Sequence, residues 1–274
     1  MSETPRRISS HDNPRFKALL KLQQSSKERR KAGRSLLDGV HLVRAYVDYA
    51  GTPEEIVVSE LALEDAEVAA LLARTGVAPL VLAHGLFREL SSVATPTGII
   101  AVVETPRPLG VPAFPGPCVM LEDIQDPGNL GSILRSAAAA GVGEVYLSRS
   151  SVQAWSPRAL RAGMGAHFAL RISEGVDLKA LVEDYPGTVL ATVRDAATSV
   201  YQADLRGRVA LLFGNEGAGL SAELVRAAHE RVSIPMPGQA ESLNVAAAAA
   251  VCLFERVRQL APPAKVERRA YRGA

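Results

Sequence analysis

The chain of 274 residues is poor in the residue types that define several other protein classes. Its only cysteines, Cys118 and Cys252, lie far apart within apolar runs, and aromatic residues make up 5% of the sequence. Neither a disulfide framework nor a zinc site is expected, because both need clustered ligands or paired cysteines. No apolar run reaches the roughly 20 residues of a membrane span, and residues 1–10 lack the apolar core of a secretory signal. We therefore predict a cytoplasmic protein without a metal site or a membrane anchor.

Positive charge is concentrated at the two ends of a chain whose formal net charge is only +2. Such basic ends on a neutral body are typical of proteins that bind a polyanion. The alternative is that these charges form solvated faces with no partner. The candidate contacts in the first stretch are Arg15, Lys17, Arg29, Arg30, Lys31 and Arg34.

Residues 1–105 alternate between helical and strand-like patterns, which predicts a small α/β domain. A first helix should begin at Pro14, with Asn13 as its cap, and residues 27–34 should form a basic turn. Strands are predicted near residues 55–58, 79–82 and 98–103, with helices over 61–73 and 84–90. His41 and His84 have no partners at metal-ligand spacing, so we interpret them as ordinary polar residues.

Residues 106–116 are rich in proline, which favours a stiff, extended linker and a domain boundary. A second domain then covers residues 117–262, and residues 263–274 form a basic tail. In this domain a strand over 118–121, a turn, a helix over 130–140 and a strand over 144–148 predict a βαβ unit. A dinucleotide-binding enzyme is one alternative. However, Gly128 and Gly131 do not fit the G-x-G-x-x-G spacing, and Arg149 stands where a ribose-binding acid is expected.

Two polar residues of this helix are candidates for a site. Asn129 fits a helix cap. Arg135 lies among small residues in the middle of the helix, where we expect it to be buried. A buried arginine needs a carboxylate or phosphate partner, because an unpaired buried charge costs several kcal/mol.

Two further loops follow predicted strands of the second domain. Residues 214–221, after a strand over 209–213, are rich in glycine and carry Glu216. Residues 234–244, after a strand over 231–235, contain Pro235, Pro237 and Gly238, a composition that suits holding a flat ligand with main-chain groups. Ser242 and Asn244 should lie in the first turn of the last helix, where the alternative role is a simple cap.

Three segments together resemble the three motifs of the SpoU (TrmH-type) RNA ribose 2′-O-methyltransferases. They are Asp126-Pro-Gly-Asn-Leu-Gly-Ser-Ile-Leu-Arg135, Leu212-Phe-Gly-Asn-Glu-Gly-Ala-Gly-Leu220 and Ile234-Pro-Met…Glu241-Ser-Leu-Asn-Val245. They occur in the order and spacing of that family and span nearly the whole second domain. The first domain resembles the L30e-like substrate-binding domain that is often fused to it.

The resemblance implies an α/β-knot (SPOUT) fold with a deep trefoil knot and a homodimer formed through the knotted domain. It implies S-adenosylmethionine as cofactor, held by Thr192, Gly214, Ile234, Met236, Ser242 and Leu243. It also implies a catalytic set of Arg135, Asn129, Glu216, Ser242 and Asn244. Arg135 would hold an RNA phosphate, with assistance in proton removal as its alternative role, and Glu216 is a base by residue type.

We accordingly expect methyl transfer from S-adenosylmethionine to a ribose 2′-OH of a structured RNA. The basic residues of the first domain would then contact RNA phosphates. Ribosomal RNA is the favoured substrate and transfer RNA the alternative. A non-catalytic RNA-binding protein of the same fold is the remaining hypothesis, against which the intact set of polar motif residues argues.

Overall fold

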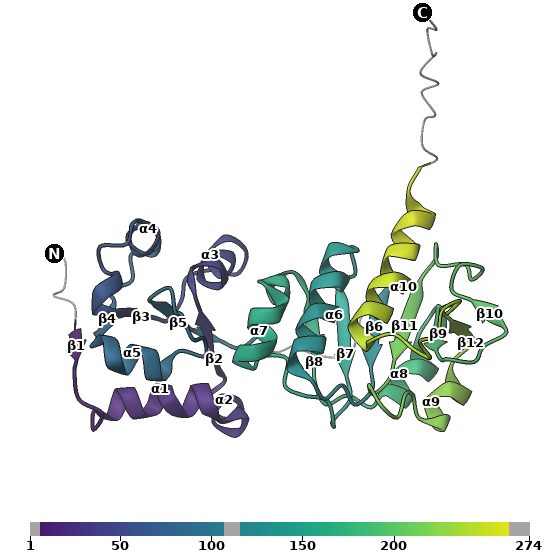
Figure 1. Ribbon diagram of the computed structural model, residues 1–274, viewed down its shortest axis with the longest axis horizontal. Helices are drawn as coiled ribbons and strands as arrows, with labels where there is room; N and C mark the ends of the chain where they lie inside the picture. Colours follow the sequence, from purple (N-terminus) through teal and green to yellow (C-terminus); the bar gives the residue numbers. More distant parts are fainter. Residues whose placement is uncertain (1–5, 107–115, 263–274) are drawn as a thin grey trace, which may run out of the picture.

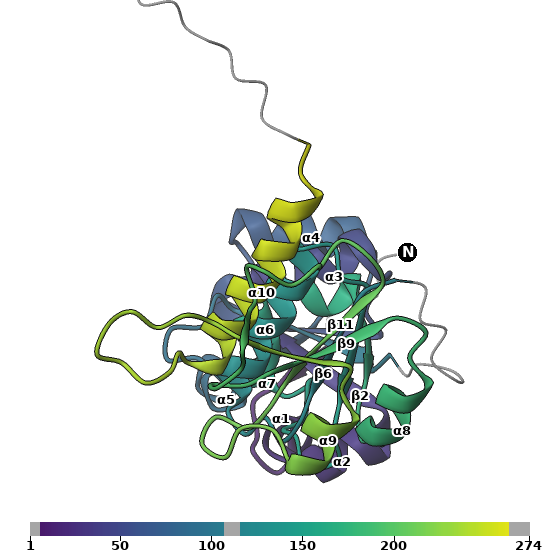
Figure 2. The ribbon, with the colours of Figure 1, turned by 90° about the vertical axis from the view of Figure 1, so that its right-hand side faces the viewer.

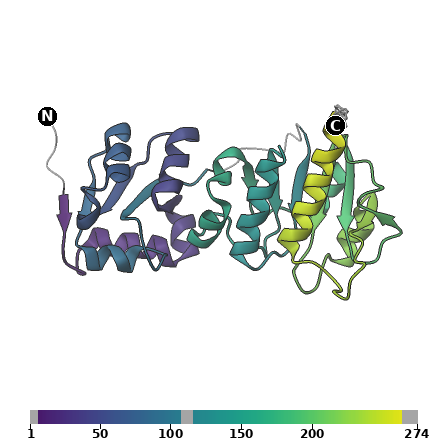
Figure 3. The same cartoon turned by 45° about the horizontal axis from the view of Figure 1, so that its top comes forward.

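The computed structural model describes residues 6–106 and 116–262, which form two α/β units side by side (Figures 1 and 3). Each unit has its own β-sheet, and helices cover both faces of each sheet. The mixed α/β class expected from the sequence is confirmed. Residues 107–115 of the expected linker and the expected basic tail lie outside the described residues.

The first unit has a five-stranded sheet of order β1-β4-β3-β5-β2, in which β5 runs antiparallel to both of its neighbours. Its strands are β1 Arg6–Ile8, β2 Arg34–Asp38, β3 Glu55–Ser59, β4 Leu80–Leu82 and β5 Ile99–Glu104. Its helices are α1 Pro14–Gln24, α2 Ser26–Ala32, α3 Val40–Tyr49, η1 Glu60–Ala62, α4 Ala66–Thr75 and α5 His84–Leu90. Alternate strand residues pack against α1 and α5 on one face and against α3 and α4 on the other.

The start of the first helix is as predicted, whereas two neighbouring predictions are wrong. The Asn13 side chain accepts hydrogen bonds from the backbone N–H groups of Arg15 and Phe16, and Pro14 occupies the first turn. The expected basic turn over residues 27–34 is instead helix α2, which Ser25 caps and which ends at Gly33 in a left-handed conformation (φ 64°). The expected helix over 61–73 is split, because Asp65 caps a new helix, α4.

The second unit has a seven-stranded, all-parallel sheet of order β10-β12-β9-β11-β6-β7-β8. Its strands are β6 Cys118–Leu121, β7 Glu144–Leu147, β8 Arg171–Ser173, β9 Thr188–Thr192, β10 Thr198–Ser199, β11 Val209–Phe213 and β12 Glu230–Ser233. Its helices are α6 Pro127–Ala139, α7 Pro157–Gly163, η2 Ala166–Ala169, α8 Leu178–Asp184, α9 Ala222–Ala227 and α10 Val245–Leu260. The dinucleotide-binding alternative is wrong, because β11, a late strand, separates β6 from β9.

The central strands of this sheet are continuous apolar runs because both faces are covered. Val119 and Leu121 face the layer that contains α6 and α10, whereas Cys118 and Met120 face α8 and α9. Burial raises the pKa of the Cys118 thiol to about 12, as expected for a core residue and not for a reactive one. The elements between residues 149 and 187 were not predicted from the sequence.

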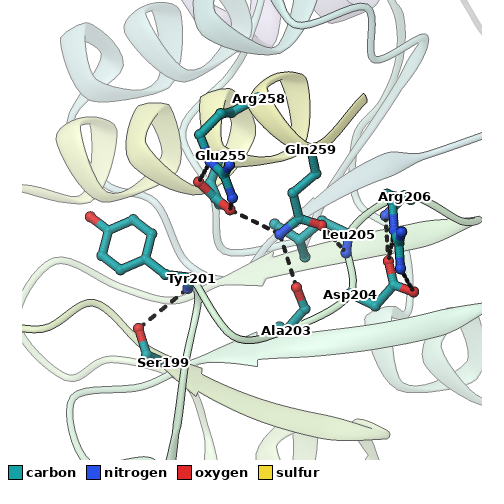
Figure 4. A network of polar contacts seen from close by, with 9 residues as sticks. All are labelled: Ser199, Tyr201, Ala203, Asp204, Leu205, Arg206, Glu255, Arg258 and Gln259. Atoms are coloured by element: carbon teal, nitrogen blue, oxygen red, sulfur yellow. Dashed lines mark hydrogen bonds and ion pairs between the residues drawn. The ribbon is translucent and has the colours of Figure 1, made fainter. Parts of the chain in front are cut away.

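Strand β12 lies between β9 and β10 in the sheet. The segment that connects β9 to β11 must therefore pass around β12. Residues 193–208 leave the end of β9, form β10 on the far side of β12 and return to the start of β11. The last helix secures this segment (Figure 4): the Gln259 side chain accepts from Leu205 N (2.9 Å) and donates to the Ala203 carbonyl (3.0 Å). The Gln259 amide also donates to the buried Glu255 carboxylate, which Arg258 pairs with in turn.

The two units share a packed boundary. Tyr46 of α3 makes an edge contact with Phe168 of η2, with ring centroids 5.3 Å apart, and Trp155 lies beyond Phe168. One apolar cluster therefore runs from α3 and α4 into the second sheet. Buried Arg29 of α2 also crosses the boundary and donates to Gln153 Oε1 at 2.9 Å.

Candidate functional site

A cavity of about 440 Å³ opens at the carboxyl ends of β9, β11 and β12. Side chains and main-chain groups at the ends of parallel strands meet at one sheet edge, where ligands bind in open α/β folds. The six residues expected to hold a cofactor all line this cavity, although they come from three separate segments. They are Thr192, Gly214, Ile234, Met236, Ser242 and Leu243.

The loop after β11 forms one wall of the cavity and has little freedom. A Cβ atom on Gly214 would lie 2.3 Å from the carbonyl carbon of Gly219, so only glycine fits there. The Asn215 side chain accepts from Gly217 N and Ala218 N, both at 2.9 Å, and donates to the Asp123 carbonyl. Asn215 was missed by the sequence analysis, and its place inside the G-N-E-G loop was the available signal. The result is a rigid wall built largely from main chain.

Three polar side chains from three segments form a chain of hydrogen bonds beside this wall. Asn244 Nδ2 donates to Asn129 Oδ1 at 2.9 Å, and Asn129 Nδ2 donates to Glu216 Oε1 at 3.0 Å. The Asn244 Oδ1 atom accepts from the backbone N–H groups of Ala246 and Ala247 and so caps α10. Backbone donors fix the position of that oxygen. The orientation of the Asn244 amide is therefore determined, and through its hydrogen bond so is that of the Asn129 amide. Each amide keeps a second N–H that this chain of bonds does not use.

Glu216 receives more donors than an ordinary surface carboxylate. Besides Asn129, it accepts from the backbone N–H groups of Gln125 and Asp126, each at 3.3 Å. Partial burial alone would raise its pKa, but the hydrogen bonds from Asn129 and from backbone N–H groups together lower it. The carboxylate is therefore ionised at neutral pH and is a weaker base than a free glutamate. This geometry suits orienting Asn129 better than removing a proton.

Two local expectations about this network are corrected. Asn129 is not the cap of α6: Asp126 is, and its Oδ1 accepts from the Asn129 backbone N–H at 2.9 Å. The Asn129 side chain is thereby left for the network. Ser242 does not lie in the first turn of α10, which begins at Val245 after the Asn244 cap. Ser242 is an exposed residue on the cavity wall.

Arg135 is also placed differently from the expectation. It is exposed on α6, not buried, and within residues 6–106 and 116–262 it makes no hydrogen bond or ion pair. It does not line the cavity, and its spacing of six residues from Asn129 puts it on another face of the helix. Glu216 and Ser242 line the cavity, Asn129 and Asn244 join Glu216 through hydrogen bonds, and Arg135 lies apart from all four within one chain.

The basic residues of the first unit have different environments. Arg15, Lys17 and Arg34 pair with Glu55, Asp12 and Glu54. Arg29 is 5% exposed, and its guanidinium donates hydrogen bonds to Gln153 and to the carbonyls of Leu22 and Gln23. The expectation of a phosphate contact by Arg29 therefore does not hold for this conformation. Arg30 and Lys31 are exposed.

The described residues provide neither a metal site nor a membrane span. Within 6–106 and 116–262, no three His, Cys, Asp or Glu residues are grouped so as to hold a metal ion. Over the same residues no helix has the length and apolar character needed to cross a bilayer. His84 Nδ1 lies 3.2 Å from the hydroxyl of Ser59, in keeping with an ordinary polar role.

Two family models match the chain. Residues 116–254 match the SpoU rRNA Methylase family, and residues 13–101 match the MRM3-like substrate binding domain. The chain is 32% identical over 265 residues to an uncharacterized tRNA/rRNA methyltransferase of Synechocystis, covering 92% of this chain and 93% of that one. It is 31% identical to the 23S rRNA (guanosine(2553)-2′-O)-methyltransferase of Bacillus subtilis, and this match covers 91% of this chain and 98% of that one.

Solved structures agree with these relatives. A crystal structure of an RNA 2′-O ribose methyltransferase superposes with a TM-score of 0.80 at 32% identity, covering 93% of this chain and 99% of that one. An AdoMet-bound rRNA methyltransferase from Sinorhizobium meliloti superposes with a TM-score of 0.81 at 29% identity, with 94% and 99% covered. These similarities extend over both units, including the substrate-binding one.

Proposed function

Because the chain belongs to the SpoU rRNA methylase family, we propose that it methylates a ribose 2′-OH of ribosomal RNA with S-adenosylmethionine as donor. The observation that carries this proposal is the chain of hydrogen bonds from Asn244 through Asn129 to Glu216, which lines the cavity. The Bacillus subtilis and Sinorhizobium meliloti proteins, which match more than nine tenths of this chain, are named for ribosomal RNA alone, which favours it over transfer RNA.

The residues of the cavity fit S-adenosylmethionine. Gly214 lets its loop fold tightly, with the backbone of Gly219 and Leu220 where a Cβ would lie, and so places main-chain groups on the cavity wall. Val232, Ile234 and Cys252 supply an apolar side, and the 234–244 segment, which projects from the body in Figure 2, supplies main-chain groups. We propose that Thr192, Gly214, Ile234, Met236, Ser242 and Leu243 hold the cofactor.

Bound S-adenosylmethionine supplies an electrophilic methyl group. The protein must then place the ribose 2′-oxygen in line with that group and stabilise the charge that develops on the oxygen as its proton leaves. The unused N–H groups of Asn129 and Asn244 are suited to this, since Glu216 and the α10 backbone fix both amides in advance. Glu216 is then a positioning residue, with Ser242 beside it on the cavity wall.

Arg135 is proposed to hold an RNA phosphate. Its exposure and its lack of any partner in the described residues leave the whole guanidinium fork for a ligand outside the chain. Arg135→Lys keeps the charge and removes the fork, so methyl transfer should fall while cofactor binding persists. Near-normal turnover in this variant would refute the role.

The assembly is also part of the proposal: a homodimer formed through the second unit, whose segment around β12 we take to be the expected trefoil knot. Its support is the two large apolar side chains that α10 leaves exposed, Phe254 at 49% and Leu260 at 47%. Phe254→Glu should give monomers in sedimentation, whereas Tyr49→Glu, at a more exposed aromatic position (76%) on the first unit, should not.

The direct test is transfer of labelled methyl from S-adenosylmethionine to deproteinised ribosomal RNA. Wild-type protein should label one ribose, and transfer RNA should be labelled weakly or not at all. The non-catalytic alternative predicts RNA binding with no transfer to either RNA. The opposite preference, for transfer RNA, would contradict the substrate assignment and leave the chemistry standing.

A further inference from the structure

A second cavity, of about 210 Å³, lies at the boundary between the two units. Arg30 of α2 reaches it from the first unit, and Arg149 reaches it from the turn that follows β7. Ser148, Ser151 and Glu174 complete the polar part of its wall. Arg30 and Glu174 also line an adjacent hollow of about 350 Å³ on the side of Trp155. The wall therefore carries two arginines and one carboxylate, from two separately matched regions of the chain.

The position of Arg30 is fixed by its buried neighbour. Arg29 Nε donates to Gln153 Oε1 at 2.9 Å, and Arg29 Nη1 donates to the carbonyls of Leu22 and Gln23 at 2.8 and 3.0 Å. A buried arginine with these partners is held in one conformation, and it ties α2 to the second unit. Arg30, the next residue of the same short helix, is thereby held at the cavity.

Arg149 supplies a charge that the protein itself does not use. Across residues 6–106 and 116–262 it forms no hydrogen bond or ion pair, and its Cγ lies beside Gly175. Glu174 is already engaged by the backbone N–H of Ala154 at 2.7 Å. Two guanidinium groups facing one carboxylate leave a net positive cavity, and planar N–H forks match the oxygens of a phosphate.

We propose that this cavity binds one phosphodiester group of the RNA substrate, held by Arg30 and Arg149. The inference rests on the proposed function for the identity of the ligand. It adds a phosphate site that spans both units, so that the first unit and the methylase unit together fix the position of the RNA strand. Such a contact sets register and orientation and reads no base.

The cavity is connected to the reaction site along the same sheet edge. Gln125 Nε2 donates to the Ser150 carbonyl at 2.8 Å, and the backbone N–H of Gln125 donates to Glu216. Strand β6 alone separates β7 from β11, which corresponds to about 10 Å across the sheet at about 4.8 Å per strand. One continuous RNA strand can therefore occupy both places.

The test is the salt dependence of RNA affinity for Arg30→Gln, Arg149→Gln and the double variant, with deproteinised large-subunit ribosomal RNA as the probe. Loss of one phosphate contact should flatten the slope of log K against log salt by roughly 0.7 to 0.9, or about five- to eightfold in affinity at about 0.1 M salt. Because both arginines hold one phosphate, the double variant should lose less than the two single losses combined. Arg88→Gln, an exposed arginine of α5 that lines neither hollow, is the charge-matched control.

A second variant should act in the opposite direction. Glu174→Gln keeps an acceptor for Ala154 N and removes the negative charge, so RNA should bind more tightly. A purely structural role for these residues predicts weaker binding or no change. Unaltered slopes in the arginine variants, or no gain from Glu174→Gln, would overturn the proposal.

The readout separates this proposal from the proposed function. RNA affinity needs no methyl transfer, so flattened slopes in a protein without transferase activity would reject the enzyme and retain the phosphate site. Calorimetry with S-adenosylmethionine should give unchanged affinity in all variants, because none of these residues lines the larger cavity. Inorganic phosphate is the last probe. If the variants bind inorganic phosphate more weakly than wild type but bind RNA equally well, the cavity binds a free anion and the proposal fails.

Discussion

The substitution Asn129→Asp changes one group of the polar network and should stop methyl transfer in a pH-dependent way. It replaces the Nδ2 atom, which lies 3.0 Å from Glu216 Oε1, with an oxygen. Two negative charges at about 3 Å repel by roughly 1.4 kcal/mol at the dielectric constant of water and about 5 kcal/mol at an effective value of 20. Glu216 is exposed, so the lower part of this range applies. The N–H that we assign to the ribose oxygen is also lost, at about 2 to 3 kcal/mol.

These terms together predict a fall in kcat of about 100-fold or more at pH 8. As the pH is lowered, the carboxylate pair should take up a shared proton, which restores a hydrogen bond between residues 129 and 216. The ratio of variant to wild-type rate should then rise. Asn129→Ala removes the donor without adding charge. Its methyl transfer should be slow, and the ratio of its rate to the wild-type rate should not depend on pH. Single-turnover transfer across pH measures both, and an Asn129→Asp rate within threefold of wild type at pH 8 would refute the reasoning.

Three further outcomes are expected. Gly214→Ala should lower stability by about 1 to 3 kcal/mol and weaken cofactor binding, because its Cβ meets loop backbone, whereas Gly238→Ala, with no atom within 4 Å, should change neither in melting and calorimetry. Burial lowers the pKa of His167 from 6.5 to about 4, so its neutral form stabilises the fold fully above pH 6.5, and about 3 kcal/mol is lost as the pH falls towards 4. Urea unfolding of His167→Gln should lack that loss. Gln259→Leu leaves Leu205 N–H without its acceptor and should speed hydrogen exchange of that amide.

The fold was largely predictable where the sequence pattern is local. Strands β6 and β11 are apolar runs bounded by glycine or polar turns, and their predicted ranges agree with the observed ones. Parallel central strands must be apolar on both faces, which makes them stand out. Helices α2 and α7 were missed because each has only seven residues, too few for a clear apolar period. Tertiary contacts, such as that of Arg29 with Gln153 in α2, stabilise helices of this length.

The candidate site was predictable in composition more than in geometry. The motifs identified Asn129, Glu216 and Asn244 as candidate residues. The hydrogen bonds that connect them, however, depend on which strands are neighbours in the sheet. Strand β11, which carries the Glu216 loop, pairs with β6, which leads into Asn129, across about 90 residues of sequence. No local sequence pattern contains that strand pairing. Only the structure could therefore show that Glu216, expected to be a base, is placed to orient Asn129.

Arg135 shows why a residue's neighbours in sequence do not determine its burial. The small residues of α6 serve the packing of that helix: a Cβ on Gly131 would lie 2.5 Å from the Ala159 carbonyl of α7. Such close packing covers only part of the helix circumference. Arg135 lies on an exposed stripe with Ser132 and Ala139, spaced three to four residues apart, so the argument that a charge among small residues must be buried and paired does not apply. The same exposure strengthens the functional assignment, because a long cationic side chain with no partner in the described chain is available to an anion that the chain does not itself contain.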